Sequence, residues 1–183
     1  MTMKKQACYL LMIGLTLIPC LGVFAQGNPE PVIDKMKAFA WMEGTWQGEA
    51  WYLGADRTKT IITQNEVISY KLDGAILTME GTGSRKDDET GKMMTVFGAF
   101  GILTWDAGES KYVLRAYRDG NYIDSDVIPN GDGSYSWFID LPYGKTRYTL
   151  RHVDDGAWNE KGEFSRDGGE NWMQIFEMTI RKK

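Results

Sequence analysis

FAWMEGTWQGEAW, residues 39–51, is the stretch that decides the fold. It brings three tryptophans and one phenylalanine to a single point of the chain, which gives that point a large apolar surface. Gly44 lets the backbone turn sharply into a strand, because glycine adopts conformations that other residues avoid. Trp46 follows two residues later, in a position to plug one end of whatever the following strands enclose. We therefore expect this stretch to form the floor of a β-barrel.

Beyond Gly44 the chain reads as a succession of strands. Aromatic and β-branched runs alternate with clusters of Gly, Asp and Asn, and Asx-Gly pairs are the strongest hairpin signal that a short sequence carries. The pattern predicts ten strands, over Thr45–Leu53, Thr58–Leu72, Ala75–Arg85, Lys92–Trp105, Lys111–Arg118, Tyr122–Ile128, Ser134–Leu141, Tyr143–Val153, Ala157–Ser165 and Trp172–Arg181.

One short helix is expected ahead of these strands. Val32, Met36, Phe39 and Ala40 follow helical spacing, and Pro31 suits a first helical turn. The spacing predicts a helix of about ten residues that ends near Gly44.

Consecutive hairpins with no helix between them form an antiparallel meander. Ten strands in one open sheet would leave two exposed edges, and closure into a barrel removes both. A two-sheet sandwich is the rival architecture, but it usually needs long crossing connections that this sequence does not contain. The predicted fold class is therefore all-β, an up-and-down antiparallel barrel of about ten strands with one short N-terminal helix.

The first 25 residues read as a signal peptide. Lys4 and Lys5 form a basic start, the apolar run Tyr9–Leu17 is too short to span a bilayer, and small residues near Ala25 suit a signal peptidase. The domain division is then a signal peptide at 1–25 and a barrel domain at 26–183. We expect a periplasmic or secreted protein that is soluble after cleavage, with no membrane span.

The alternative is that the protein is attached to a membrane by a lipid on Cys20. Pro19, however, stands where a lipobox needs a small residue. Both cysteines, Cys8 and Cys20, lie in the predicted signal peptide, so the mature domain is expected to have no disulfide. Cleavage would remove two lysines and no acidic residue, and this changes the formal net charge from −4 to −6. An acidic surface argues against nucleic acid as a partner.

Gly44-Thr45-Trp46, placed after a short helix and before the first strand, resembles the signature of the lipocalin-like, or calycin, barrels. In that superfamily an arginine from the last strand packs across the tryptophan. The resemblance implies that Arg181 lies over Trp46 and closes the base of the barrel through a cation–π contact.

Gly44–Glu49 and Phe164–Trp172 together resemble an exported bacterial family of unknown function with this barrel. The second segment also matches an Asp-box, the hairpin motif known from sialidases. Asp167 is expected to accept backbone N–H groups within its own turn, Gly169 to take a positive φ, and Trp172 to fold back as a plug. We interpret Ser165, Asp167, Gly169 and Trp172 as a structural clamp.

Gly44-Thr45-Trp46-Gln47-Gly48 also resembles the start of the nitrobindins, haem-binding relatives of the calycins. Their axial histidine lies near the C-terminus, whereas the last predicted strand here contains none. The single histidine, His152, is the candidate ligand for this alternative, and alternation along its strand points it inward. No cofactor is expected otherwise, and no metal cluster is visible.

The barrel interior is the predicted site. Aromatic side chains with a few polar groups typically line ligand pockets, and Arg115 with Tyr117 resembles the Arg-x-Tyr pair that holds a carboxylate in fatty-acid-binding relatives. The candidate ligand-binding residues are Trp51, Arg115, Tyr117, Trp137, Tyr148 and His152.

Catalysis has no support in the sequence, because there is no nucleophile elbow and no partner for the one histidine. We predict a binding protein rather than an enzyme, with a small lipophilic or aromatic molecule as its partner. The remaining alternative is a structural or interaction barrel whose core is filled by its own side chains.

Overall fold

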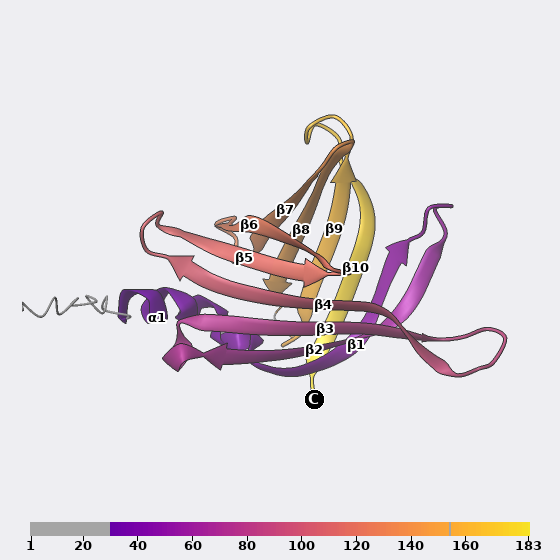
Figure 1. The fold of residues 1–183 in the computed structure, drawn as a ribbon, viewed down its shortest axis with the longest axis horizontal. Helices are drawn as coiled ribbons and strands as arrows, with labels where there is room; N and C mark the ends of the chain where they lie inside the picture. The colour runs from indigo at the N-terminus through magenta and orange to yellow at the C-terminus, as the bar shows by residue number, and fades with distance from the viewer. Residues whose placement is uncertain (1–29, 154) are drawn as a thin grey trace, which may run out of the picture.

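A computed structural model describes residues 30–153 and 155–183 (Figure 1). The predicted signal peptide and the candidate anchor Cys20 lie outside these residues. A short α-helix, α1 (Glu30–Met36), runs directly into a 3₁₀ helix, η1 (Lys37–Met42), and the strands follow. The strands are β1 (Gly44–Leu53), β2 (Lys59–Lys71), β3 (Ile76–Lys86), β4 (Met93–Asp106), β5 (Lys111–Arg118), β6 (Asn121–Pro129), β7 (Tyr135–Leu141), β8 (Gly144–His152), β9 (Trp158–Ser165) and β10 (Met173–Lys182), with a 3₁₀ turn, η2 (Leu72–Gly74), between β2 and β3.

The ten strands form a closed antiparallel barrel of up-and-down topology. Each strand pairs with its neighbours in the sequence, and β1 pairs with β10 to complete the wall. The predicted fold class is confirmed, and the predicted bounds of the fifth strand match those of β5. Figure 1 shows α1 beside one end of the barrel and the β3–β4 hairpin extending beyond the other strands at the opposite end.

The helical segment seals one end of the barrel. Met36, Phe39 and Met42 are fully buried there, together with Trp46 at the start of β1. Trp46 donates its indole N–H to the carbonyl of Met42 over 2.7 Å. The hydroxyls of Tyr70 and Tyr112 donate to the carbonyls of Met36 (2.6 Å) and Lys35 (3.0 Å). These bonds satisfy carbonyls at the end of α1 and tie it to the wall, so this end is the base.

Lys182, rather than Arg181, supplies the cation at the base, and the prediction for Arg181 is wrong. The ammonium of Lys182 lies 5.2 Å from the centre of the Trp46 ring. Arg181 instead forms an exposed ion pair with Asp155. The register explains the difference, because Trp46 pairs with Lys182 across β1 and β10. A shift of one residue turns a side chain to the opposite face of a strand.

The turn between β9 and β10 has the predicted clamp geometry. Asp167 accepts hydrogen bonds from the backbone N–H groups of Glu170 and Asn171, and Gly169 has a φ of 108°. The indole of Trp172 donates to the carbonyl of Gly169 over 2.9 Å. The hydrogen bond from the Asn171 backbone, with those from the side chains of Ser165 and Asn171, lowers the pKa of the Asp167 carboxyl strongly.

Ser165 is the buried centre of this clamp. Its hydroxyl donates to Asp167 over 2.6 Å and accepts the backbone N–H of Gly169 over 2.9 Å. Replacing Ser165 with alanine leaves the Gly169 N–H without this acceptor, and we expect the free energy of unfolding to fall by about 1–3 kcal/mol.

Urea denaturation of the purified domain measures this loss. Thr45→Ala is the matched control, because Thr45 is exposed and its hydroxyl forms no hydrogen bond with any described residue. The control is expected to change stability by less than about 0.5 kcal/mol. Equal effects of the two variants would show that the clamp contributes nothing.

The wall is weakest between β6 and β7. Backbone pairing there is confined to Ile128 with Ser136 and Pro129 with Tyr135, whereas every other pair of neighbouring strands shares a longer ladder. Further along, the backbone N–H of Phe138 donates to the hydroxyl of Ser125 over 2.9 Å. A side chain therefore takes the place of a backbone carbonyl across this seam.

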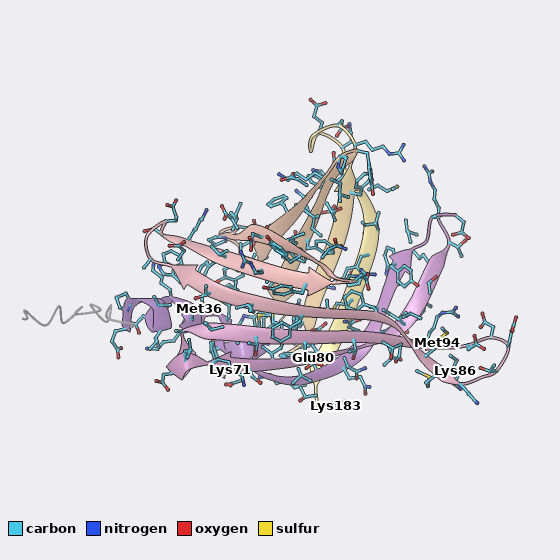
Figure 2. All side chains as sticks on the ribbon, in the orientation of Figure 1. Met36, Lys71, Glu80, Lys86, Met94 and Lys183 are labelled. Atoms are coloured by element: carbon cyan, nitrogen blue, oxygen red, sulfur yellow. The ribbon has the colours of Figure 1, made fainter. Side chains whose placement is uncertain are left out.

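The exposed surface carries charged side chains, such as Lys71 and Glu80, and also apolar ones, such as Val67 and Met94. Figure 2 places Lys71 near the base end of the long β2–β4 strands, Glu80 midway along β3, and Lys86 and Met94 at the start of the extended hairpin. In the part of the chain that the structure describes, no helix is long and apolar enough to cross a membrane.

Candidate functional site: the barrel cavity

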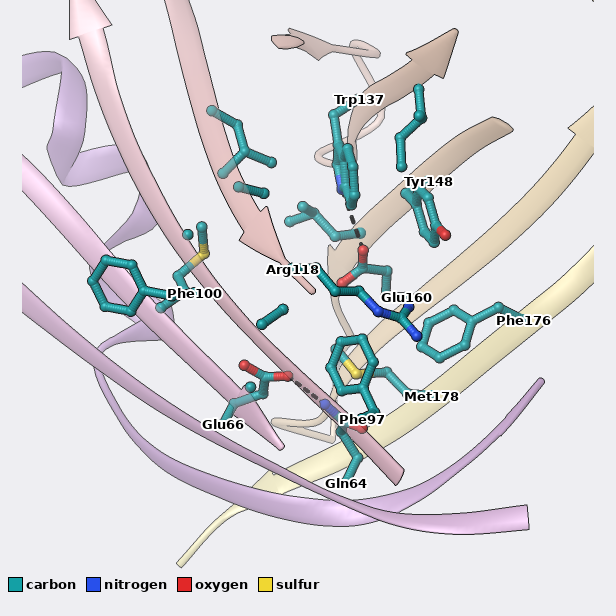
Figure 3. A pocket seen from close by; sticks show the side chains of 18 of the residues that line it. Gln64, Glu66, Phe97, Phe100, Arg118, Trp137, Tyr148, Glu160, Phe176 and Met178 are labelled. Atoms are coloured by element: carbon teal, nitrogen blue, oxygen red, sulfur yellow. Dashed lines mark hydrogen bonds between the residues drawn. The ribbon is translucent and has the colours of Figure 1, made fainter. Parts of the chain in front are cut away.

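A cavity of about 470 Å³ occupies the barrel above the base. Its volume falls within the range of about 300–1,000 Å³ that is typical of small-molecule sites. Most of its wall is apolar, and the aromatic side chains come from strands on several sides: Tyr52, Phe97, Phe100, Tyr117, Tyr122, Trp137, Tyr148, Trp158 and Phe176. Figure 3 shows several of these rings around a common space.

Two glutamates project into this apolar space. Glu66 on β2 and Glu160 on β9 each retain only 8% exposure, although both lie on the cavity wall. Figure 3 shows both carboxyl groups directed toward the interior from different sides. In each strand the glutamate shares the inward face with apolar residues, Ile68 in β2 and Trp158 in β9. Alternation along the strands therefore places both carboxyls inside.

Each buried carboxyl accepts one hydrogen bond from a described side chain. The amide of Gln64 donates to Oε1 of Glu66 over 2.7 Å, and the indole of Trp137 donates to Oε1 of Glu160 over 3.2 Å. Neither glutamate forms an ion pair with any described residue. Gly81 faces Glu66, and a Cβ on Gly81 would stand 2.6 Å from Oε1. The missing side chain at position 81 thus makes the room in which the Glu66 carboxyl lies.

Burial shifts the titration of both groups. Desolvation raises the pKa of Glu66 to about 7. It raises the pKa of Glu160 to about 8, and the nearby Glu66 charge adds to this shift. The two carboxyls therefore hold protons near neutral pH that exposed carboxyls would have lost.

The two glutamates lie toward the base of the cavity. Glu66 pairs with Trp46 in the β1–β2 register, and Trp46 belongs to the base. Glu160 stands two residues after Trp158, whose ring packs edge-on against Trp46 at 5.9 Å. The indole N–H of Trp158 is buried and forms no hydrogen bond with any described residue. The deep end thus combines two carboxyls with an unpaired donor.

Arg118 marks the opposite, open end. It lies on the cavity wall at the end of β5, pairs with Asp119 over 3.1 Å, and stacks over Phe97 at 4.8 Å. Of the described residues that line the cavity, Arg118 is the only Lys, Arg or His. The two acidic groups thus come from the base end of the cavity, and the one basic group among the described lining residues comes from the far end of β5.

Three of the six predicted ligand-binding residues lie on the cavity wall. Trp137 and Tyr148 stack against each other at 4.2 Å with an interplanar angle of 11°. Burial and the neighbouring Glu160 raise the pKa of Tyr148 to about 12, so its hydroxyl stays protonated. Tyr117 is 41% exposed and lines the mouth. Whether these three side chains bind a ligand remains a prediction.

Trp51 and Arg115 lie on the outer face, so their predicted places in the pocket are wrong. Trp51 carries the ammonium of Lys59 over its ring at 3.6 Å. Arg115 forms two hydrogen bonds with the Asp124 carboxylate, at 2.6 and 2.7 Å. Both residues have the parity opposite to inward neighbours, Ala50 in β1 and Leu114 in β5. The predicted Arg-x-Tyr carboxylate holder does not form inside this barrel.

His152 does not line the cavity, which corrects the third prediction. It is the last residue of β8 and is exposed, with its ring stacked on Trp41 at 4.9 Å. At this level η1 fills the barrel, so a side chain of inward parity meets the helix instead of the cavity. His152 is therefore not placed to be an axial ligand of a haem inside the barrel.

The sequence interpretation missed the most polar part of the site, formed by Gln64, Glu66, Arg118 and Glu160. The sequence contained a signal for these polar residues. In β2, the face that carries Ile62 and Ile68 also carries Gln64 and Glu66. Polar side chains inside an otherwise apolar inward face indicate a site, since burying them without a purpose is costly.

Comparison with solved structures supports the fold. The S-type phycobiliprotein lyase CPES from Guillardia theta is similar over 83% of this chain and 93% of its own, with a TM-score of 0.56 and 10% sequence identity. At this identity the likeness concerns the fold alone. No family model matches the sequence. No curated protein matches it either.

Proposed function

We propose that the protein binds a small, partly apolar molecule in the barrel cavity and releases it without chemical conversion. The main support for this proposal is the cavity itself, which is about 470 Å³ in volume and lined mainly by aromatic and aliphatic side chains. A barrel filled by its own core would leave no such space, so the cavity argues against a purely structural role.

The polar groups of the cavity favour binding over catalysis. They are few among mainly apolar side chains, as expected for groups that orient a guest. The likeness to the phycobiliprotein lyase is one of fold, and we propose no lyase activity. Export, with cleavage after Ala25 and a place in the exported family that the Gly44 and Ser165 motifs suggest, is part of the proposal and rests on the sequence.

Fluorescence titration with N-phenyl-1-naphthylamine tests this function. The probe is neutral at pH 7, and its emission rises in an apolar site. We expect saturable binding by the domain from residue 26 onward, with a dissociation constant in the micromolar range, which corresponds to about −8 kcal/mol. Binding should also raise the melting temperature as the probe concentration increases.

Ala116→Phe should abolish the saturable signal, because Ala116 lines the cavity and a phenyl group would occupy part of it. Val67→Phe is the matched control, since Val67 is exposed on the outer face of β2. A saturable signal that survives in Ala116→Phe, or its absence from the unmodified domain, would contradict the proposal.

A further inference from the structure

The deep end of the cavity is built to receive hydrogen-bond donors. Gln64 and Trp137 each donate to one oxygen of a buried carboxyl. The second oxygen of Glu66 and that of Glu160 accept no hydrogen bond from any described residue. A carboxylate can accept several hydrogen bonds, so both groups are only partly satisfied. A guest in the cavity can supply the missing donors.

The two carboxyls also favour a guest that carries a positive charge. In their charged form, two buried carboxyls without a counter-ion cost free energy, and a positive charge placed between them would offset that cost. Arg118 forms no ion pair with either glutamate, and its guanidinium pairs with Asp119 over 3.1 Å instead. An anionic guest would meet the two glutamates at the base, which disfavours it. A cation with N–H donors satisfies both requirements.

The surrounding wall suits the body that would carry such a cation. Trp137 and Tyr148 are stacked as a flat double layer next to Glu160, and the ring of Phe176 lies 6.1 Å from that of Tyr148. Aromatic faces attract cations and pack against flat apolar groups. Apart from Arg118, which pairs with Asp119, and Asn121, the other lining residues near the open end are apolar or aromatic.

We propose, building on the binding function above, that the guest is a cationic amphiphile: an amine on a flat apolar body, with its ammonium group between Glu66 and Glu160. The ammonium supplies the N–H donors that the carboxyls lack, and the body lies along Trp137 and Tyr148. The dispositions of Glu66, Glu160, Trp137 and Tyr148 in Figure 3 fit this arrangement.

Three probes with one ring system test the charge preference. They are 2-naphthylmethylamine, 2-naphthylmethanol and 2-naphthoic acid, which are cationic, neutral and anionic at pH 7.5. Isothermal titration calorimetry with the domain from residue 26 onward should give the amine a dissociation constant at least about 10-fold below that of the alcohol. The acid should bind most weakly.

The double variant Glu66→Gln/Glu160→Gln removes both charges and keeps the side-chain shapes. It should weaken amine binding by about 30-fold or more and change alcohol binding by less than about threefold. Glu80→Gln is the matched control, because Glu80 is an exposed glutamate on the outer face of β3. It should leave all three affinities unchanged.

Proton release gives a second readout that a change in shape alone would not produce. An ammonium group lowers the pKa of a neighbouring carboxyl, so amine binding at pH 7.5 should release about one proton from Glu66 and Glu160 together. The apparent enthalpy should then depend on the buffer, and this dependence should vanish in the double variant. The other titratable residues on the described wall are Arg118 and tyrosines 52, 117, 122 and 148.

The outcomes separate the two proposals. Equal affinities for the amine and the alcohol, or tightest binding of the acid, would overturn the cationic guest and leave the binding function standing. Failure of every probe, N-phenyl-1-naphthylamine included, would overturn the binding function itself. Loss of amine binding in Glu80→Gln would place the amine outside the cavity and overturn the inference.

Discussion

Trp46→Ala is expected to lower the free energy of unfolding by about 3–5 kcal/mol, which is the usual range for removing a fully buried tryptophan. Trp46 is 0% exposed and packs against Trp41 and Trp158 at 6.1 and 5.9 Å. The substitution also leaves the Met42 carbonyl without its indole donor and Lys182 without the ring beneath it. Packing, hydrogen bonding and the cation–π contact are lost together at the base.

Urea denaturation monitored by far-ultraviolet circular dichroism measures this loss. Trp51→Ala is the matched control, because the same residue type lies five positions later on the outer face of β1. It loses a contact with Lys59 and should cost about 1 kcal/mol or less. Trp46→Phe should fall between the two, since it keeps a ring and loses the N–H. Similar losses at positions 46 and 51 would contradict the assignment of Trp46 to the sealed base.

The second large effect is a loss of stability as the pH rises. Glu66 and Glu160 have pKa values of about 7 and about 8 in the folded barrel, raised from 4.5 mainly by desolvation. Between pH 4.5 and 8 the folded state therefore binds more protons than the unfolded state. Stability falls with rising pH wherever this holds. One unit of pKa shift corresponds to about 1.4 kcal/mol, so the two shifts together set an upper bound of about 8 kcal/mol, and we expect a decrease of at least about 2 kcal/mol across this window.

Glu160→Gln should raise stability at pH 8 and flatten this profile, because glutamine fills the same space without titrating. Urea denaturation at intervals between pH 4.5 and 8.5 gives the curve for both proteins. Below pH 4.5 the two should converge, since both glutamates are then protonated in the folded and unfolded states. A wild-type profile that rises between pH 5 and 8 would show that these carboxyls are not buried as the barrel places them.

The sequence determined the architecture because hairpin chemistry is local. Asx-Gly pairs such as Asp119-Gly120 and the Asp155-Gly156 pair fix where strands end, and both glycines have a positive φ. With every turn short, each strand has to pair with its sequence neighbour, and only closure satisfies the two edges. Gly44 and Trp46 could be assigned to the base for the same reason, as their roles depend on neighbours within a few residues.

The site was less predictable because it depends on register and on the end of each strand. Arg181 and Lys182 are adjacent, and only the pairing of Trp46 with Lys182 decides which of them faces the indole. His152 has inward parity, but the helix beneath it decides that it stacks on Trp41. Trp51 and Arg115 could have been assigned to the outer face by counting alternate residues from Trp46 and Leu114. That count works only once the inward face of a strand is known.

The short ladder between β6 and β7 has a consequence for how a guest reaches the deep end. Local opening of a protein proceeds where the fewest backbone bonds are broken. Amide hydrogens of β6 and β7 should therefore exchange with deuterium earlier than those of β2 and β3. Separation along this line would uncover Trp137 from the side and give large guests a lateral route past Arg118. The rate of guest release would then be set by how often β6 and β7 separate.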